Sequence, residues 1–318
     1  MAKKDPLADA LAKVAVLKRI DDRAAMLETV NALLGEKSSY VVSRVADVAA
    51  DRGVRESVPA MVARLTRLFD DPKSDDIGAT AALALVKALI AFEAGFEAED
   101  VAIRATQHAR FEKVMGGSVD VAVSVRGHAA ILLAAMGSTQ ALRCASELLA
   151  EADQRPPGER SSWPARADAA RALGMIGSDG AAAVLRFKLL IGDNEAAVLS
   201  DCLSGLLSIE RDAALPLAER MLTSDDDAHA EAALLAVGGW RDPRAFDVLH
   251  AHAPRFLSSR SRELFLATIA MTRQPKAIEY LLTLAAAASD RSLHTAAIKA
   301  LEPLRMLPGV GERLDAMK

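Results

Sequence analysis

The sequence predicts an all-α solenoid, a stack of antiparallel helix pairs, and three observations carry this prediction. Hydrophobic residues make up 51% of the chain and aromatic residues only 4%, and much of the apolar content is alanine and leucine, which favour helix over strand. Apolar positions recur with a period of 32 residues. Glycine or proline interrupts each repeat at the same place, so each unit is predicted to be a helix, a tight turn and a second helix.

The repeat appears as columns of apolar residues that share a helix face. The second helix of each unit carries two columns four residues apart, which is one helical turn. These columns are Ala181, Ala213, Ala245 and Ala277, and then Leu185, Leu217, Leu249 and Leu281. The first helix carries two columns three residues apart, which are Ala170, Cys202, Leu234, Leu266 and Ile298, and then Leu173, Gly205, Val237, Ile269 and Leu301. Each pair of columns predicts one buried stripe per helix.

The N-terminal part, residues 1–117, is predicted to hold capping helices and divergent helix pairs. Residues 7–34 are expected to be helical and to cap the stack, because a terminal unit must shield the end of the core. A helix pair is predicted over 40–51 and 58–69, and two longer helices over about 75–94 and 99–115. No strand is expected, and the Gly-Gly pair that follows the last of these helices is interpreted as a helix break.

Residues 118–318 are predicted to form the regular array, with one insertion. Gly137 and Gly177 mark equivalent turns but lie 40 residues apart instead of 32. The extra residues fall in a loop near 153–163, where a Pro-Pro-Gly sequence disfavours helix. A Trp-Pro sequence at Trp163 is expected to restart the helix.

Two segments of this array resemble a known repeat. Residues 125–137 read Val-Arg-Gly-His-Ala-Ala-Ile-Leu-Leu-Ala-Ala-Met-Gly, and residues 165–177 read Ala-Arg-Ala-Asp-Ala-Ala-Arg-Ala-Leu-Gly-Met-Ile-Gly. Both resemble the bacterial HEAT-like repeat, the type also found in phycobilin lyases, over roughly residues 118–305. The resemblance implies a right-handed α-solenoid of stacked helix pairs. It implies no particular activity, because the shared residues are core and turn positions.

Charge and cysteine content narrow the class of protein. The net charge of -4 and pI near 5.9 argue against a surface built throughout for nucleic acid. Residues 201–250 hold 4 Lys/Arg and 10 Asp/Glu (net -6), whereas residues 251–318 hold 10 and 6 (net +4). The two cysteines form no CxxC spacing, which fits a reducing cytoplasm. The most apolar segment, residues 78–96, is interrupted by Lys87 and Glu93, so no membrane span is expected.

No residue pattern indicates catalysis, a metal or a cofactor, so a protein without enzymatic activity is favoured. Cys202 belongs to a column of core residues, which predicts a buried thiol. None of the six histidines is followed by glutamate, so the His-Glu motifs of the HEAT-like deoxyhypusine hydroxylases are missing. The aspartates at 225–227 lack the glycine and the distant glutamate of a calcium loop and are expected to cap the next helix.

The favoured function is a protein-interaction scaffold whose partner is another protein. A solenoid offers a long concave surface, which is expected to be lined by the second helices. Mixed charge on their non-core positions suits a polar protein surface better than a phosphate backbone. The candidate partner-binding residues are Arg186, Lys188, Arg220, Trp240, His250 and Arg255.

The alternative is a nucleic-acid-binding enzyme that resembles the HEAT-like alkylpurine DNA glycosylases. Trp163, Trp240 and the C-terminal arginines favour it, whereas the net acidity and the scarcity of aromatic residues for base stacking oppose it. A bilin lyase ranks last, because only the repeat supports it. A phosphate-binding surface would use the basic residues Arg255, Arg260, Arg262, Arg273 and Lys276. Glu263, Glu279 and Asp290 are expected to neutralise them, so no duplex binding is predicted near physiological salt.

Overall fold

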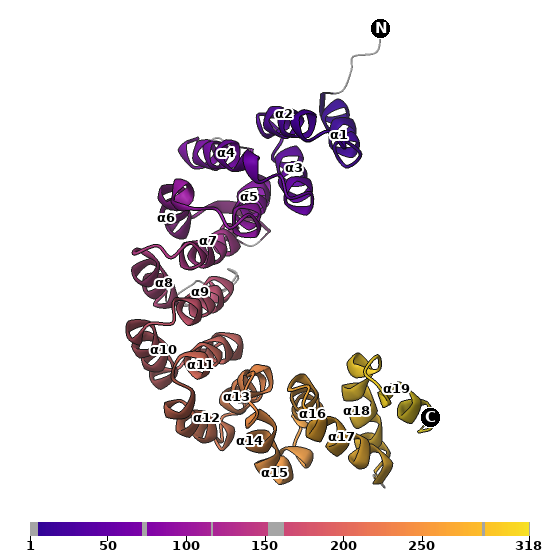
Figure 1. Ribbon diagram of the computed structural model, residues 1–318. Helices are drawn as coiled ribbons and strands as arrows, with labels where there is room; N and C mark the ends of the chain where they lie inside the picture. Colours follow the sequence, from indigo (N-terminus) through magenta and orange to yellow (C-terminus); the bar gives the residue numbers. More distant parts are fainter. Residues whose placement is uncertain (1–5, 72–74, 116, 152–161, 288–289, 318) are drawn as a thin grey trace. The chain divides into compact units, whose positions relative to one another are not determined.

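The computed structural model describes residues 6–71, 75–115, 117–151, 162–287 and 290–317. Its helices stack in pairs, which confirms the predicted all-α solenoid (Figure 1). The chain divides into two compact units, Met1–Ile176 and Gly177–Lys318. None of the helices in the described ranges is both long and apolar enough to span a membrane.

The N-terminal unit follows the predicted order of helices. These are α1 Pro6–Leu17, α2 Arg23–Leu34, α3 Ser39–Asp51, α4 Val58–Asp70, α5 Thr80–Ala91, α6 Glu99–Gln107, α7 Val123–Ala135, α8 Ala141–Leu149 and α9 Trp163–Ile176. Helices α3, α5, α7 and α9 pack successively on one another, and α4, α6 and α8 form the second layer of the unit (Figure 1). Helix α9 begins at Trp163, as predicted, and most of the predicted insertion lies outside the described residues.

A β-hairpin replaces the end of a predicted helix in this unit. Helix α6 ends at Gln107, and strands β1 Phe111–Val114 and β2 Gly117–Asp120 pair in antiparallel register. The predictions of a helix over 99–115 and of no strand are therefore wrong. Phe111 and Val114 belong to residue types that favour strands, and Gly117 begins the second strand, opposite Val114.

The helix expected over 75–94 also begins later than predicted. Gly78 and Ala79 have φ of 67° and 52°, in the left-handed region, so the α-helix begins only at Thr80. Asp76 caps it, because its carboxylate accepts hydrogen bonds from the N–H groups of Ala81 and Ala82 at 2.8 and 3.0 Å.

The C-terminal unit contains the regular repeats. Its helices are α10 Asp179–Ile191, α11 Ala196–Glu210, α12 Leu215–Leu222, α13 Asp227–Gly239, α14 Ala245–Ala251, α15 Ala253–Leu257, α16 Arg262–Met271, α17 Pro275–Ala287, α18 Arg291–Leu301 and α19 Val310–Asp315. Cys202, Leu234 and Leu266 from one predicted column are buried, whereas Ile298 of that column is half-buried. Ala213 of a second-helix column is exposed, because it lies in the turn before α12 and not on that helix. Asp226 caps α13 by accepting a hydrogen bond from the N–H of Ala228 at 2.8 Å, as expected for that aspartate run.

The first helices of this unit pack more closely than the second helices. Helix α11 packs on α13, α13 on α16 and α16 on α18, while α12, α14 and α17 form the more widely spaced layer (Figure 1). In a bent stack of helices the closely packed layer lies on the concave side. The expectation that the second helices line the concave surface is therefore wrong within this unit, where the first helices occupy that side.

Candidate functional site

A cavity of about 680 Å³ opens on the first-helix layer of the C-terminal unit. It runs from the end of α13 across α16 to α18 and the turn that follows, and we call it the first-helix groove. Ala267, Ala270, Ala296 and Ala300 line it where larger side chains would fill the space between the helices. Volumes of this order are typical of ligand and peptide sites. The groove is thus a hollow left by small residues on adjacent first helices.

Larger apolar side chains complete the lining of the first-helix groove. Leu264 and Met271 lie two turns apart on α16, and Leu304 closes the far end after α18. Gly239 lies at the near end, and a Cβ added to it would meet no atom within 4 Å. The interior of the groove therefore suits an aliphatic side chain better than a polar one.

The rim of the groove carries three cations and one anion. Arg241 donates from Nη1 to the carbonyl oxygen of Met271 at 3.5 Å. Lys299 pairs with Glu263 at 2.7 Å, and both side chains are largely exposed, at 72% and 67%. Water screens such an exposed ion pair, so opening it costs little. The Arg273 guanidinium makes no ion pair or hydrogen bond with the described residues, and the rim is electropositive.

Arg273 also has an unfavourable backbone conformation. Its φ is 55°, in the left-handed region, and it lies three repeats after Gly177, which has φ of 66° at the equivalent turn. Glycine adopts this conformation freely, whereas a residue with a Cβ loses about 1–2 kcal/mol. Strained residues of this kind cluster at functional sites, and the side chain of Arg273 lines a cavity.

Three of the predicted partner-binding residues are held by contacts inside the unit. Arg186 pairs with Glu210, Lys188 pairs with Asp193 at 2.8 Å, and Arg255 donates to the carbonyl oxygen of Ser224. These contacts join each second helix to a neighbouring segment and stabilise the stack. A side chain that is already paired has less to offer a partner, because the existing contact must be broken first.

The other three predicted residues lie on three different elements of the unit. Arg220 and His250 are exposed on α12 and α14, and the His250 ring stacks on Phe246 with centroids 5.2 Å apart. Trp240 is half-buried directly after α13, with the Arg244 guanidinium 5.2 Å above its ring. The role of all six residues in partner binding stays a prediction.

Most of the basic C-terminal residues are neutralised locally. Arg260 pairs with Asp227, Arg262 with Asp290 at 3.0 Å, and Lys276 with Asp247 at 2.5 Å. Asp290 is thus a partner, as expected. Glu263 and Glu279 instead pair with Lys299 and Arg313, so that part of the expectation is wrong. The phosphate-binding surface that the alternative function requires is therefore interrupted by carboxylates.

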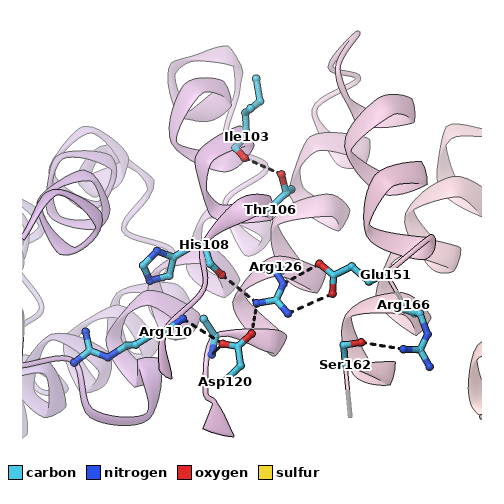
Figure 2. A network of polar contacts seen from close by, with 10 residues as sticks. Ile103, Thr106, His108, Arg110, Asp120, Arg126, Glu151, Ser162 and Arg166 are labelled. Atoms are coloured by element: carbon cyan, nitrogen blue, oxygen red, sulfur yellow. Dashed lines mark hydrogen bonds and ion pairs between the residues drawn. The ribbon is translucent and has the colours of Figure 1, made fainter. Parts of the chain in front are cut away.

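A second polar cluster lies in the N-terminal unit, around the buried Arg126 (Figure 2). Its Nη1 donates to Asp120 Oδ2 at 2.5 Å and to the carbonyl oxygen of His108 at 3.1 Å. Its Nη2 donates to Glu151 Oε2 at 3.4 Å. Asp120 Oδ1 also accepts from the N–H of Ala122 at 3.0 Å, so the cluster joins the hairpin to α7 and to the end of α8.

The Arg126 cluster borders a cavity of about 420 Å³ but is built as a support for the fold. Its guanidinium is matched by two carboxylates, and burial lowers the pKa of the neighbouring His108, which favours the uncharged ring. Cys144 lines the cavity and is itself buried. In the other unit, burial raises the pKa of Cys202, which disfavours the thiolate that a nucleophile requires.

The residues that line the groove are absent from the predicted partner-binding set, although the sequence contains a signal for two of them. Arg241 and Arg273 are 32 residues apart and occupy the same turn position, which is the signal that marks them as neighbours in a stack. The alanines that create the hollow look like ordinary helix formers in the sequence.

Comparison with known proteins gives a structural likeness and no family. No protein-family model matches the chain, and no curated protein matches it in sequence. It is similar to the phycocyanin lyase complex of CpcE and CpcF from Nostoc sp., at 18% identity over 81% of this chain and 94% of that chain, with a TM-score of 0.42. Human deoxyhypusine hydroxylase matches at 16% identity over 85% and 92%, with a TM-score of 0.31. An engineered protein matches at 16% identity over 97% and 82%, with a TM-score of 0.35. Likeness at this level assigns no activity.

Proposed function

We propose that this chain is a non-catalytic protein-interaction scaffold and that the first-helix groove is its main binding surface. The observation that carries the proposal is the open cavity of about 680 Å³ on the closely packed helix layer, with an apolar interior and an electropositive rim. A partner that placed two large aliphatic side chains in the groove would gain about 1.5–3 kcal/mol from each. That contribution is enough to anchor a specific contact that polar groups at the rim then orient.

The proposal is tested by filling the groove. Ala267 is half-buried in its lining on α16, so Ala267→Trp would occupy the space that a partner side chain requires. The matched control is Ala183→Trp on α10, where the alanine is exposed on the other helix layer. The full chain and both variants are immobilised, and the proteins that each retains from a lysate of the source cells are quantified by mass spectrometry.

We expect a defined set of proteins to be retained in equal amounts by the wild type and by Ala183→Trp. The retained amount of each should be at least tenfold lower with Ala267→Trp. Circular dichroism and thermal melting of the three proteins check that each variant is folded. Equal retention by Ala267→Trp and the wild type would show that partners bind elsewhere. Retention lost equally in both tryptophan variants would point to a general effect of the added side chain, and would also count against the groove.

A further inference from the structure

We propose that the segment bound in the first-helix groove is an acidic amphipathic helix of a partner protein, with two carboxylates about seven residues apart beside its apolar face. This inference rests on the proposed function and specifies the chemistry of the partner. The juxtaposition that carries it is a pair of arginines one repeat apart, Arg241 and Arg273, on the rim of an apolar hollow that crosses three first helices.

The spacing of the two arginines sets the spacing of the carboxylates. They occupy equivalent turns after α13 and α16, and Arg241 reaches the carbonyl oxygen of Met271, two residues before Arg273. Packed helices lie about 8–10 Å apart, so the two turns that carry Arg241 and Arg273 are separated by about one such step. A helix rises about 1.5 Å per residue, and about seven residues therefore span the step and return to the same face.

Arg273 provides the strongest charge for recognition. Its guanidinium has no partner among the described residues, and its backbone has the left-handed φ of 55° that glycine adopts at the equivalent turn. The turn would form more easily with glycine, so the arginine side chain contributes something other than local stability. A carboxylate bound to a guanidinium by two parallel hydrogen bonds is the pairing that best uses this group.

The extent of the groove favours a helix over a compact ligand. It reaches from Gly239 on α13 to Leu304 after α18 and so crosses three stacked helices. Two interhelical steps span roughly 16–20 Å, which corresponds to about three turns of helix. Such a segment places aliphatic side chains at successive turns over the small residues Ala267 and Ala300, in the way that amphipathic helices occupy grooves.

The remaining charges at the rim discriminate against a basic partner. The one acidic residue that lines the groove, Glu263, is already paired with Lys299 at 2.7 Å. A basic segment would meet Arg241 and Arg273 unpaired, and like charges at close range are unfavourable. An acidic segment meets two arginines directly and gains a third cation when the exposed Lys299 pair opens.

The test selects the ligand from random sequences, so the partner need not be identified first. A library of random 16-residue peptides is displayed and selected against the immobilised full chain. The enriched peptides are then synthesised with a fluorescent label, and their affinities are measured by anisotropy. The protein variants are Arg273→Gly, Arg273→Lys and Ala267→Trp. Arg67→Gln serves as the control, because Arg67 is an exposed arginine on α4 in the other unit and does not line the groove.

We expect enriched peptides to carry aliphatic residues at helical spacing and two acidic residues about seven positions apart. Arg273→Gly should lower the affinity for these peptides at least tenfold, Arg273→Lys should retain part of the affinity, and Arg67→Gln should leave it unchanged. Replacing both acidic residues of the peptide by glutamine should remove the effect of Arg273→Gly. Two results would overturn the acidic partner but support the groove, provided that Ala267→Trp abolishes binding. The first is enriched peptides without acidic pairs, and the second is an affinity that Arg273→Gly leaves unchanged. An affinity that Ala267→Trp also leaves unchanged would overturn both proposals.

Discussion

Two arginines, one in each unit, show how the same side chain supports the fold in one place and remains available in another. Arg126 is buried, and its guanidinium is matched by Asp120, Glu151 and a backbone carbonyl. Arg273 is exposed, lines a cavity and has a strained backbone. The buried arginine with a matched charge indicates a contact that the stack requires, whereas we propose that the exposed and strained one binds a partner protein.

The largest change in the free energy of unfolding is expected when the buried ion pair between Arg126 and Asp120 is broken. Arg126→Leu would leave Asp120 buried without its cation, and removal of one partner from a buried ion pair costs about 3–5 kcal/mol. The loss in the free energy of unfolding is measured by denaturation with guanidinium chloride, followed by circular dichroism. The double variant with Asp120→Asn should recover part of it, because the amide removes the buried charge and can still accept a hydrogen bond from the Ala122 N–H. A loss below about 1 kcal/mol in Arg126→Leu would mean that Arg126 is not the support described above.

A glycine in each unit extends the comparison from charge to packing. Gly127 on α7 lies against α9, and a Cβ added to it would be 2.4 Å from Asp168 Oδ2. Gly127→Ala should therefore destabilise the chain by about 1–3 kcal/mol through overpacking. Gly239 borders the open groove with no atom in reach of an added Cβ, so Gly239→Ala should leave stability unchanged or raise it by up to about 1 kcal/mol. Equal losses in the two variants would show that the groove is not open.

The two cysteines report separately on the opening of the two units. Cys144 and Cys202 are both buried, one in each unit, so a thiol reagent should label neither in the native state. Labelling rates at increasing denaturant, read by mass spectrometry of peptides, then show which unit opens first. Cys202→Ser should cost about 1–3 kcal/mol, because a hydroxyl would be buried without an assured partner. Rapid native labelling of Cys202 would contradict its place in the core.

Helix periodicity was enough to predict the solenoid, because every repeat contributes to the same columns. Cys202, Leu234 and Leu266 are buried as the period requires, although Ala213 of another column is exposed. The hairpin was missed because its strands have four residues each, which is too short for an alternating pattern to stand out from a helix end. The groove was missed for another reason: it depends on which helix layer packs more closely, and this is a property of the stack that a single repeat does not contain.

The smallest effect concerns the backbone of Arg273, and it separates stability from binding. Arg273→Gly should relieve about 1–2 kcal/mol of left-handed strain and lose about 0.5–1 kcal/mol to the greater freedom of glycine in the unfolded chain. The net change is a gain of roughly 0.5 kcal/mol in the free energy of unfolding, measured by urea denaturation.

Gly137→Ala is the reciprocal control in the N-terminal unit, because Gly137 has φ of 69° and no atom within 4 Å of an added Cβ. That variant should lose about 1 kcal/mol from backbone strain alone. A clear loss of stability in Arg273→Gly would mean that the arginine side chain stabilises the unit, and the contrast with Arg126 would no longer hold.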